Sequence, residues 1–478
     1  MGPIIGPKNG LEKSLPYNTV MSHITPLCLI YYCYGSSKPS SIPGPDPSTE
    51  QDGNLPDISR AGSLHEYLLD LHKTYGDIAS FWMGRQFVVS ICSPELFKEH
   101  QNVFDRPPEL FKLFETFLGP KSIQYANKGD GRKRRNNYDK MLAHEKLKEY
   151  YHIFQNVADD LEKKWGQLVK EEHIPLGQYM SAFAIKVVLN TLFGEYFTTD
   201  KEILAFRRNY DICWSELERS LTDQPDPDSP RVKAFEDANK IITSLIKKAI
   251  EHRKKVPPNS DSELLIDSLI DNASDEEELL SDAITYAVGG FHTTGNVLTW
   301  GFYFLATHED FQEKAVKEIK QVLGNENVDA SNMSRLKYLH QILDETMRCA
   351  VVAPWAARFQ DFDSELGGHK IPKNTPVIHA LGVSLQNEKY FPLPNKFDPD
   401  RFNTENSKGR PSMAFQPFGF AGKRVCPGYR FAYAEAIVCL VTLLRKFKVK
   451  MVEGQVVTPV HGLVTHPEEE IWVKIQKR

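Results

Sequence analysis

Residues 418–428 have the sequence Phe-Gly-Phe-Ala-Gly-Lys-Arg-Val-Cys-Pro-Gly, and an apolar run of helical character, residues 429–444, follows at once. Cys426 thus stands just before the first turn of a helix. The amides and the partial positive charge of a helix N-terminus lower the pKa of a thiol and favour the thiolate, the form that binds metals. The segment therefore predicts a metal-ligating cysteine, with a buried loop cysteine as the plainer alternative.

Three neighbours of Cys426 suit a flat, anionic macrocycle beside the sulfur. Gly422 and Gly428 carry no side chain that would block a planar ligand. Arg424 supplies a cation that can pair with a carboxylate such as a haem propionate. We expect all three residues to lie against a haem group.

Glu345 and Arg348 lie three residues apart in a run, 336–347, whose apolar residues have helical spacing. They share one helix face and can form an ion pair. A Glu-x-x-Arg pair is expected by chance about once in a chain of this length, so a solvated surface pair is the alternative.

The order of further motifs decides between these interpretations. Arg358 follows Pro354, and then come residues 368–375 (Gly-His-Lys-Ile-Pro-Lys-Asn-Thr), residues 397–402 (Phe-Asp-Pro-Asp-Arg-Phe) and the cysteine loop, with Phe-Asp-Arg-Pro far upstream at 104–107. This succession resembles the cytochrome P450 superfamily, the haem-thiolate monooxygenases, from about residue 55 to the C-terminus. The resemblance implies a mainly α fold with a small β portion, in which haem lies between a long central helix and a cysteine-ligand loop that precedes a helix.

The resemblance also implies roles for charged residues. Glu345, Arg348 and Arg401 would form a buried ion-pair triad on the haem side of the core. Removing one member of such a triad would leave the others uncompensated. Arg358 and Arg424 would hold the haem propionates.

A run of helical character from about residue 275 to 307 would extend about 50 Å at the standard rise. Ser274 and Glu277 have the spacing of a capping box at its start. Three glycines inside the run, Gly290 among them, each cost about 1 kcal/mol against Ala in a helix. Close approach of Gly290 to a haem face is one reason for them, and contact with a neighbouring helix is the other.

Residues 289–294 (Gly-Gly-Phe-His-Thr-Thr) resemble the oxygen-activating segment of the family, where an acid normally precedes the threonine. Here His292 takes the place of the acid. Thr293 would hydrogen-bond dioxygen and relay protons, and a histidine can also shuttle protons near neutral pH. The alternative keeps His292 as a helix residue bonded to a carbonyl, without a catalytic role. Substrate contacts are expected on the apolar side near Val288 and Phe291.

Two departures from the family pattern concern the haem surroundings. A Trp four residues before an Arg usually caps one propionate, yet residues 130–135 (Asp-Gly-Arg-Lys-Arg-Arg) contain no Trp, so one of their arginines would have to serve. The cysteine loop carries one residue more than usual, Phe420. These features, together with residues 52–56 and 62–66, resemble the orphan family-twenty branch of animal cytochromes P450, which has no agreed substrate.

By this resemblance the protein is an oxidoreductase that inserts one oxygen atom from dioxygen into an apolar, lipid- or sterol-like substrate. Cys426 would be the axial ligand of the iron in haem b, and its thiolate would help to split the O–O bond. Electrons would come from NADPH through a flavoprotein reductase, whose acidic surface could meet Lys423, Arg430 and the basic residues 132–135. That cluster is explained equally well as a solvated helix face.

Two other functions stay open. An isomerase or dehydratase that needs no dioxygen and rearranges a peroxide is favoured by the missing acid before Thr293. A haem-binding sensor or carrier without catalysis is suggested by the altered loop and the absent Trp.

The composition excludes several classes of protein. With 41% hydrophobic and 25% charged residues, the chain can bury a large globular core. Its net charge of -5 shows no excess of Lys and Arg of the kind that marks a nucleic-acid partner. Seven cysteines, an odd number without a CxxC pair, argue against a disulfide framework and a structural zinc site.

We expect residues 1–54 to be a Pro/Gly/Ser-rich segment and hinge, and residues 55–478 to form a single catalytic domain. The hinge is the stretch 42–47 (Ile-Pro-Gly-Pro-Asp-Pro), which prolines stiffen. The apolar run 24–34 contains Pro26 and is far short of the roughly 20 residues that a spanning helix needs. Because animal relatives are usually held on the endoplasmic reticulum, we expect association with the cytosolic face of that membrane.

The predicted elements are a helix over 64–75, strands over 78–82 and 87–91, and further strands near 367–378 and after 447. Long helices should fill most of the chain up to about residue 350. Two Pro-containing stretches, 223–227 and 257–260, break that helical region as loops.

Overall fold

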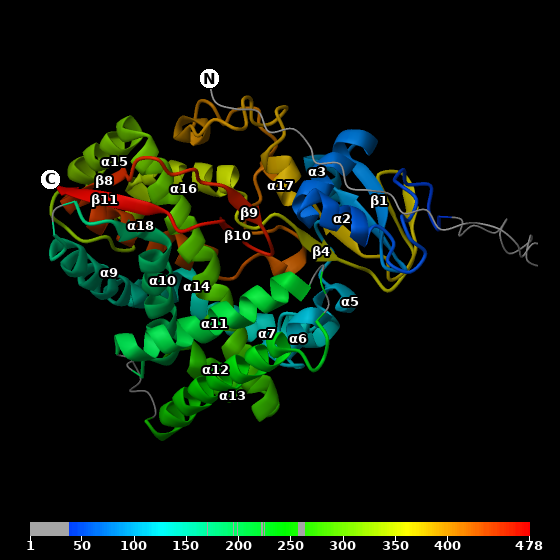
Figure 1. Ribbon diagram of the computed structural model, residues 1–478, viewed down its shortest axis with the longest axis horizontal. Coiled ribbons are helices and arrows are strands. Elements are labelled where there is room, and N and C mark those ends of the chain that lie inside the picture. Colours follow the sequence, from blue (N-terminus) through cyan, green and yellow to red (C-terminus); the bar gives the residue numbers. More distant parts are fainter. Residues whose placement is uncertain are drawn as a thin grey trace, which may run out of the picture. The chain divides into compact units, whose positions relative to one another are not determined.

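Helix α14 (Glu276–Thr307) organises the fold, and in Figure 1 it runs through the middle of the helical part. Its first turn is capped by Asp275, whose side chain accepts a hydrogen bond of 2.9 Å from the Glu278 amide. The expected capping box of Ser274 and Glu277 is therefore wrong by one residue, because Asp275 occupies the N-cap position. Ser274 instead donates to the carboxylate of Glu278. The helix packs against α10 (Leu176–Phe193) and α16 (Lys337–Ala350).

The structure is a computed structural model that describes residues 38–478 apart from 170, 195, 198, 221, 222, 224 and 257–262. The other α-helices are α2 (Leu55–Ala61), α3 (Leu64–Tyr75), α4 (Pro94–His100), α5 (Pro108–Phe111), α6 (Glu115–Leu118), α7 (Lys128–Tyr138), α8 (His144–Leu147), α9 (Tyr151–Gly166), α11 (Asp200–Ser220), α12 (Pro230–Lys255), α13 (Leu265–Asn272), α15 (Glu309–Val322), α17 (Leu381–Leu385) and α18 (Tyr429–Lys446). Short 3-10 helices are η1 (Lys112–Phe114), η2 (Asp139–Leu142), η3 (Lys148–Tyr150), η4 (Met333–Arg335), η5 (Pro399–Phe402), η6 (Ser412–Ala414) and η7 (Gly422–Arg424).

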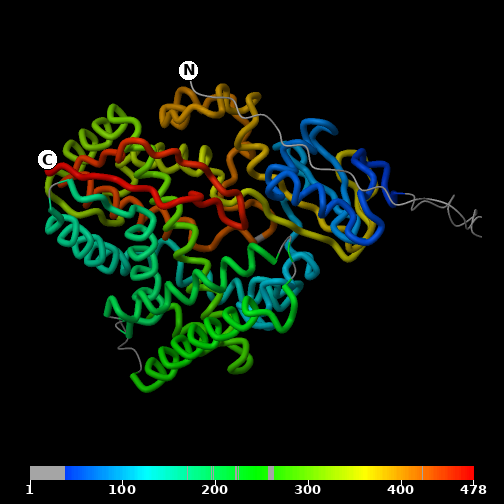
Figure 2. Tube along the Cα trace, in the orientation of Figure 1, coloured from blue at the N-terminus to red at the C-terminus, as the bar shows by residue number. Residues whose placement is uncertain are grey.

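The strands form small sheets beside the helices. They are β1 (Ile78–Met83), β2 (Gln86–Ile91), β3 (Ile174–Pro175), β4 (Ala356–Arg358), β5 (Ser364–Leu366), β6 (His369–Ile371), β7 (Val377–His379), β8 (Phe447–Met451), β9 (Pro459–His461), β10 (Thr465–Pro467) and β11 (Trp472–Lys477). The largest sheet has the order β1-β2-β7-β4, and its last pairing sets Arg358 opposite Val377. A second sheet, β3-β11-β8, brings the C-terminal strands, red in Figure 2, beside α9 and α10.

The mainly α fold with a small β portion is confirmed. The helix over 64–75 ends at Gly76 as expected, because that residue has a φ of 91°, which glycine adopts without strain. The hairpin, the strands near 367–378 and the described loop residues 223 and 225–227 also agree with the sequence interpretation, whereas strands β3 and β4 were missed. The stretches 24–34 and 257–260 lie outside the described residues.

The proline-stiffened hinge packs onto the first strand. Ile42 is buried, and the Ser80 amide donates a hydrogen bond of 2.8 Å to the Pro43 carbonyl. Ser40–Arg478 form one compact unit, which begins before the expected boundary after residue 54. The division into a segment 1–54 and a catalytic domain 55–478 stays a prediction. Among the described residues, none of the helices has the length and apolar character needed to cross a membrane.

Candidate functional site

A cavity of about 460 Å³ lies where α14, the loop before α18 and the end of β4 converge. Cys426 lies on one wall, and Thr293 of α14 is among the residues of another. Arg358 and Arg424 line the same space. The structure therefore brings together four of the residues that the sequence marked as a site.

Cys426 is held by its own loop, because its amide donates a hydrogen bond of 3.0 Å to the Phe418 carbonyl. Burial raises the pKa of the Cys426 thiol, while the Gly428 amide and Arg135 oppose that rise. The expected lowering by the amides at the helix N-terminus is present through Gly428, but burial outweighs it. A cationic metal that binds the sulfur would supply the missing stabilisation of the thiolate.

The two glycines that the sequence marked in the cysteine loop, Gly422 and Gly428, are needed for different reasons. Gly428 lines the cavity, and a Cβ there would meet the Cys426 sulfur only at 4.0 Å, so this position is open beside the sulfur as expected. Gly422 does not line the cavity. Its φ is +59°, and a Cβ would lie 2.9 Å from Cα of Phe104, so the loop needs glycine there for its backbone and not for a macrocycle. Gly419 lies on the cavity wall, where Gly422 was expected.

Four arginines line the cavity. They are Arg106, Arg135, Arg358 and Arg424. Arg106 donates to the Gln124 carbonyl at 2.7 Å, and Arg358 donates to the Ala357 carbonyl at 2.7 Å. Only Arg135 has a carboxylate partner among the described residues, Asp139 at 2.9 Å.

We call the other three arginines, Arg106, Arg358 and Arg424, the cavity arginines. Burial, and then repulsion from neighbouring arginines, lowers the pKa of each. The Nε atom of each is buried and has no hydrogen-bond partner among the described residues. Crowded, unneutralised donors of this kind fit a dianionic ligand such as the two propionates of haem. The site thus fits haem through its sulfur, its open glycine and its donors.

The basic residues 132–135 of α7 do not act as one cluster. Arg132 and Lys133 are exposed, whereas Arg134 is buried and pairs with Asp282 of α14. Arg135 reaches the cavity side and donates to the Val425 carbonyl at 2.8 Å. Arg135 is therefore the member of this stretch placed to meet a propionate.

The glycines of α14 answer the question that the sequence left open. A Cβ on Gly290 would come within 2.9 Å of Val188 on α10, and one on Gly295 within 3.2 Å of Ser181. Contact between helices thus explains both, although Gly290 also lines the cavity. A Cβ on Gly289 would meet nothing within 4 Å, so only this glycine leaves free space on the cavity wall.

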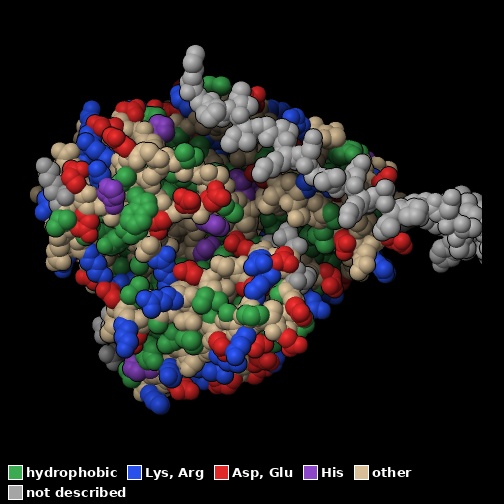
Figure 3. All heavy atoms as spheres, in the orientation of Figure 1, with side chains coloured by type: hydrophobic (Ala, Val, Ile, Leu, Met, Phe, Trp, Pro, Cys, Tyr) green, Lys and Arg blue, Asp and Glu red, His purple; other side chains and the backbone are tan. Residues whose placement is uncertain are grey.

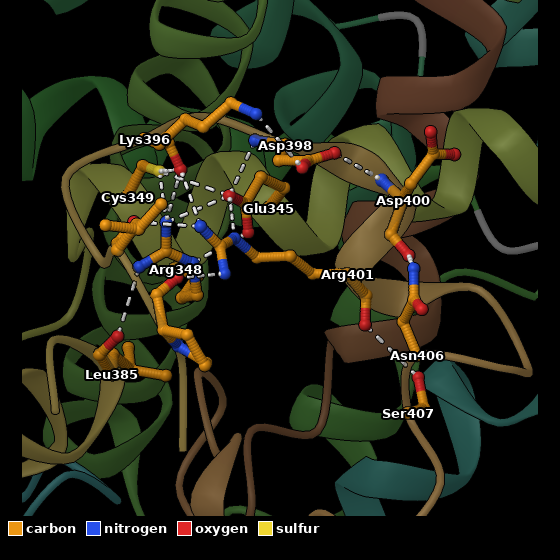
Figure 4. Close-up of polar contacts among 12 residues, drawn as sticks. Glu345, Arg348, Cys349, Leu385, Lys396, Asp398, Asp400, Arg401, Asn406 and Ser407 are labelled. Atoms are coloured by element: carbon orange, nitrogen blue, oxygen red, sulfur yellow. Dashed lines mark hydrogen bonds and ion pairs between the residues drawn. The ribbon is translucent and has the colours of Figure 1, made fainter. Parts of the chain in front are cut away.

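The predicted triad is assembled in the core beside α16. Arg348 Nε lies 2.7 Å from Glu345 Oε2, and Arg401 Nε lies 3.2 Å from Glu345 Oε1. Figure 4 shows the three side chains converging near the Lys396 carbonyl, which accepts from both arginines. The Asp398 amide also donates to Glu345, at 2.8 Å. Each charge of the triad is thus compensated within the protein.

The cytochrome P450 family model matches residues 43–474 of this chain. The chain belongs to the cytochrome P450 family. It is 36% identical to cytochrome P450 20A1 of Homo sapiens over 455 residues, which is 94% of this chain and 96% of the relative, and equally similar to the Bos taurus protein of that name. Cytochrome P450 3A17 of Cavia porcellus is 26% identical over 458 residues, 88% of each chain. The protein is thus a haem-thiolate oxidoreductase of the monooxygenase type, with an organic substrate and a redox partner.

In this P450, His292 stands in place of the usual acid, but it does not face the cavity as expected. His292 does not line the cavity, and its ring lies 4.7 Å from Trp214 and 5.3 Å from Tyr210 of α11. Burial lowers the pKa of His292 to about 4, so the ring is neutral near pH 7. Its Nε2 is buried without a partner, which also makes the carbonyl-bonded alternative wrong for that atom.

Thr293 does face the cavity, and its hydroxyl donates to the Gly289 carbonyl at 3.3 Å. Val288 and Phe291, expected as substrate contacts, are buried but are not among the lining residues. Phe291 packs instead on Tyr210 at 4.6 Å. The helix is rotated so that residues 289, 290 and 293 face the cavity.

The extra residue of the cysteine loop has a place of its own. Phe420 is buried and packs on His379 of β7 at 4.6 Å and on Phe97 of α4 at 4.8 Å. His379 in turn shares a hydrogen bond of 2.8 Å with His100. The insertion is therefore absorbed by the sheet side of the loop, and Cys426 keeps its position on the cavity wall.

Sequence reasoning missed two site residues, Arg106 and Glu435. Arg106 stood inside the Phe-Asp-Arg-Pro motif, which served only as a marker of the family. Glu435 lies inside the apolar run after Cys426, where a lone acid is a signal in itself. Both line the cavity.

Proposed function

We propose that this P450 inserts one oxygen atom into an apolar organic substrate of lipid or sterol type, with electrons from NADPH delivered by a flavoprotein reductase. The observation that carries the proposal is the cavity itself, where Cys426 and Thr293 lie on walls of one space that the cavity arginines also line. When bound there, haem would supply the activation of dioxygen. Cys426 would hold the iron, while Arg106, Arg135, Arg358 and Arg424 would hold the propionates.

The substrate class is supported by the apolar part of the lining. It includes Phe111, Phe114, Val188, Trp214, Val297 and Leu463, from five separate segments of the chain. Such a wall binds apolar carbon skeletons by excluding water. Thr293, which lines the cavity, would orient a polar ligand and hand on a proton from its hydroxyl.

The electron route is supported by exposed cations. Arg132, Lys133 and Arg430 are exposed, and Arg132 and Lys133 lie on the same helix as Arg135 of the cavity. An acidic reductase surface would be attracted to them. The side chain of Lys423 lies outside the described part. On the face drawn in Figure 3, by contrast, Lys, Arg, Asp and Glu side chains are interspersed over α11 and α12. The proposal includes attachment to the endoplasmic reticulum, because animal relatives are usually located on that membrane.

One observation favours a second candidate, a peroxide isomerase or dehydratase that needs no dioxygen: the position before Thr293 carries no acid, and His292 faces α11. A haem-binding sensor stays as a third candidate.

The first test is the absorption spectrum of the reduced, carbon monoxide-bound protein beside a Cys426→Ala control. We expect a red-shifted Soret band that the substitution abolishes. A band at the position of histidine-ligated haem would refute the proposal. NADPH and dioxygen consumption with a purified reductase then separates the candidates, since an isomerase would turn over a hydroperoxide without either, and a sensor would consume neither.

A further inference from the structure

The uncharged polar side chains on the cavity wall differ in whether they have a hydrogen-bond partner. Thr191 and Thr285 donate to carbonyls one turn earlier in their helices, at 2.8 and 2.7 Å. Thr293 and Thr294 do the same over 3.3 Å. Gln124 carries the one side-chain amide among the described residues that line the cavity. Its carbonyl and its N–H of the backbone are bonded, but its side-chain amide has no hydrogen bond within the described part of the chain.

The loop that carries Gln124 is fixed by its backbone. The Gln124 carbonyl accepts a hydrogen bond of 2.7 Å from Arg106. One residue earlier, the Ile123 carbonyl accepts from Arg424 at 2.8 Å, and the Ile123 N–H donates to Asp282 of α14 at 2.7 Å. A side chain on a backbone held at three points starts from a defined place, which is what selective recognition of a ligand needs.

A chain of hydroxyls beside Gln124 determines which groups can still donate to a ligand. The backbone N–H of Gln124 donates to the Ser122 hydroxyl at 3.0 Å, and that hydroxyl lies 2.6 Å from the hydroxyl of Thr285. Because Thr285 donates its own proton to the Ser281 carbonyl, the bond of 2.6 Å uses the Ser122 proton. Both hydroxyl donors are thus occupied. The side chain of Gln124 keeps two donors and one acceptor for a ligand.

The place of Gln124 along α14 indicates the size of that ligand. Through Ser122, the loop is joined to α14 at Thr285, which lies eight residues before Thr293, and both threonines line the cavity. Eight residues of an α-helix rise about 12 Å. A ligand with a polar group at Gln124 and its other end at Thr293 therefore has an apolar skeleton of about that length.

We propose that Gln124 is a specificity-determining residue, whose side-chain amide binds an uncharged oxygen group, a hydroxyl or a carbonyl, at one end of the apolar substrate. An amide donates to a carbonyl, and it both donates to and accepts from a hydroxyl. An ionised group at this place would lose more hydration free energy than one neutral amide returns. This inference rests on the proposed function, whose substrate class it narrows.

The first experiment measures the binding of matched ligands to the haem-loaded protein, followed by the absorption of the haem. The ligands are straight-chain primary alcohols of increasing length, each beside the alkane and the carboxylate of the same length. In Gln124→Leu, which removes the amide at similar size, affinity for the alcohols should fall about three- to tenfold while affinity for the alkanes stays or rises. Gln124→Asn, which keeps an amide of shorter reach, should lie between the wild type and Gln124→Leu.

Thr191→Val is the matched control. It also removes a polar group from the cavity wall, but one whose proton already goes to the Val187 carbonyl. We expect it to change the affinities for alcohol and alkane alike. The proposal would be overturned if Gln124→Leu changed both affinities by the same factor, or if the wild type bound none of the alcohols. Loss of affinity in Gln124→Leu for the carboxylates alone would mean that the recognised group is an anion, which also contradicts it.

The second experiment locates the oxygen atom that the enzyme inserts. With NADPH and a purified flavoprotein reductase, the wild type should convert a long alcohol to a diol whose new hydroxyl lies far from the first. One oxygen atom of dioxygen enters a C–H bond, and the other leaves as water with two electrons from NADPH. In Gln124→Leu the position of the new hydroxyl should spread along the chain, and an unchanged product distribution would count against an anchor at Gln124.

The two experiments also separate this inference from the proposed function. Binding of the alcohols needs no turnover. A wild type that bound them through Gln124 but gave no diol, with NADPH and dioxygen unconsumed, would contradict the monooxygenase proposal and leave the recognition by Gln124 in place. A wild type that formed products without any effect of Gln124→Leu on binding or position would do the reverse.

Discussion

Two groups of buried or half-buried arginines in this P450 differ in how their positive charge is neutralised. In the triad, Arg348 and Arg401 both bind Glu345, and backbone carbonyls such as that of Leu385 take further donors. The cavity arginines Arg106, Arg358 and Arg424 have no carboxylate partner among the described residues. One group is completed by the protein itself. The other is arranged for an anion that the protein must bind.

The comparison shows how buried charge distinguishes architecture from a binding site. A buried ion needs a partner, so an internally satisfied group points to folding and an unsatisfied group points to a ligand. Except for Arg106, the arginines of both groups were named from the sequence by the same kind of motif. Only the partners of their side chains separate the two uses.

Glu345→Gln should have the largest effect on the protein without haem. It leaves the buried Arg348 and the half-buried Arg401 without the carboxylate that they share, which costs about 3–5 kcal/mol of unfolding free energy. Urea unfolding of the apoprotein, followed by circular dichroism, measures the loss. Glu405→Gln serves as the control, because Glu405 pairs with Lys408 on the surface and its removal should change stability little. Equal losses in the two variants would show that the triad is not compensated as described.

Arg358→Met should behave in the opposite way. Removing one of three mutually repelling cations leaves the stability of the apoprotein unchanged or raised, but haem is lost more readily. One charge-assisted hydrogen bond contributes about 1.5–3 kcal/mol, which corresponds to about a tenfold to hundredfold weaker affinity. Transfer of haem to an excess of apomyoglobin measures the change.

Arg134→Met is the matched control for that prediction. Arg134 is also a buried arginine near α14, but it pairs with Asp282 and does not line the cavity. Its substitution should destabilise the apoprotein, since Asp282 is left without its cation. If Arg358→Met destabilised the apoprotein as much as Arg134→Met, the cavity arginines would be structural and the comparison would fail.

The sequence was informative wherever a local pattern sets the structure. The helix over 64–75, the hairpin after it and the Glu345–Arg348 pair follow from spacing along the chain, and all are present. The position of Cys426 followed from a motif of eleven residues, and its loop absorbed Phe420 without moving it off the wall.

The sequence was uninformative wherever the rotation of a helix, or a contact with a distant part of the chain, determines which way a residue faces. Four consecutive basic residues of α7 point in different directions, and only the packing of that helix selects Arg135 for the cavity. The rotation of α14 likewise decides that His292 faces away from the cavity, and the sequence alone does not show that rotation. Gly422 is explained by the approach of Phe104, more than three hundred residues earlier in the chain, and no local pattern shows such a contact.

Asp344→Asn should give the smallest effect and sharpen the comparison within one helix turn. Asp344 is adjacent to Glu345, but its partner is the Tyr433 hydroxyl and not a guanidinium. Burial raises the pKa of Asp344 from 3.8 to about 6, and Tyr433 opposes that rise. The folded protein therefore holds this proton more tightly than the unfolded chain does. Stability is greatest below the usual pKa and falls as the pH rises from 3.8 to about 6.

In Asp344→Asn this dependence on pH should disappear. The difference in unfolding free energy between wild type and variant should therefore change with pH over that window, with a slope that corresponds to the uptake of at most one proton. Urea unfolding at a series of pH values measures it. Tyr433→Phe should extend the window to higher pH, because the ionised carboxylate loses its hydroxyl donor. A wild type whose stability instead rises over this window relative to the variant would mean that Asp344 is compensated as fully as Glu345, and that the neighbourhood of the triad, not its ion pairs, satisfies buried charge.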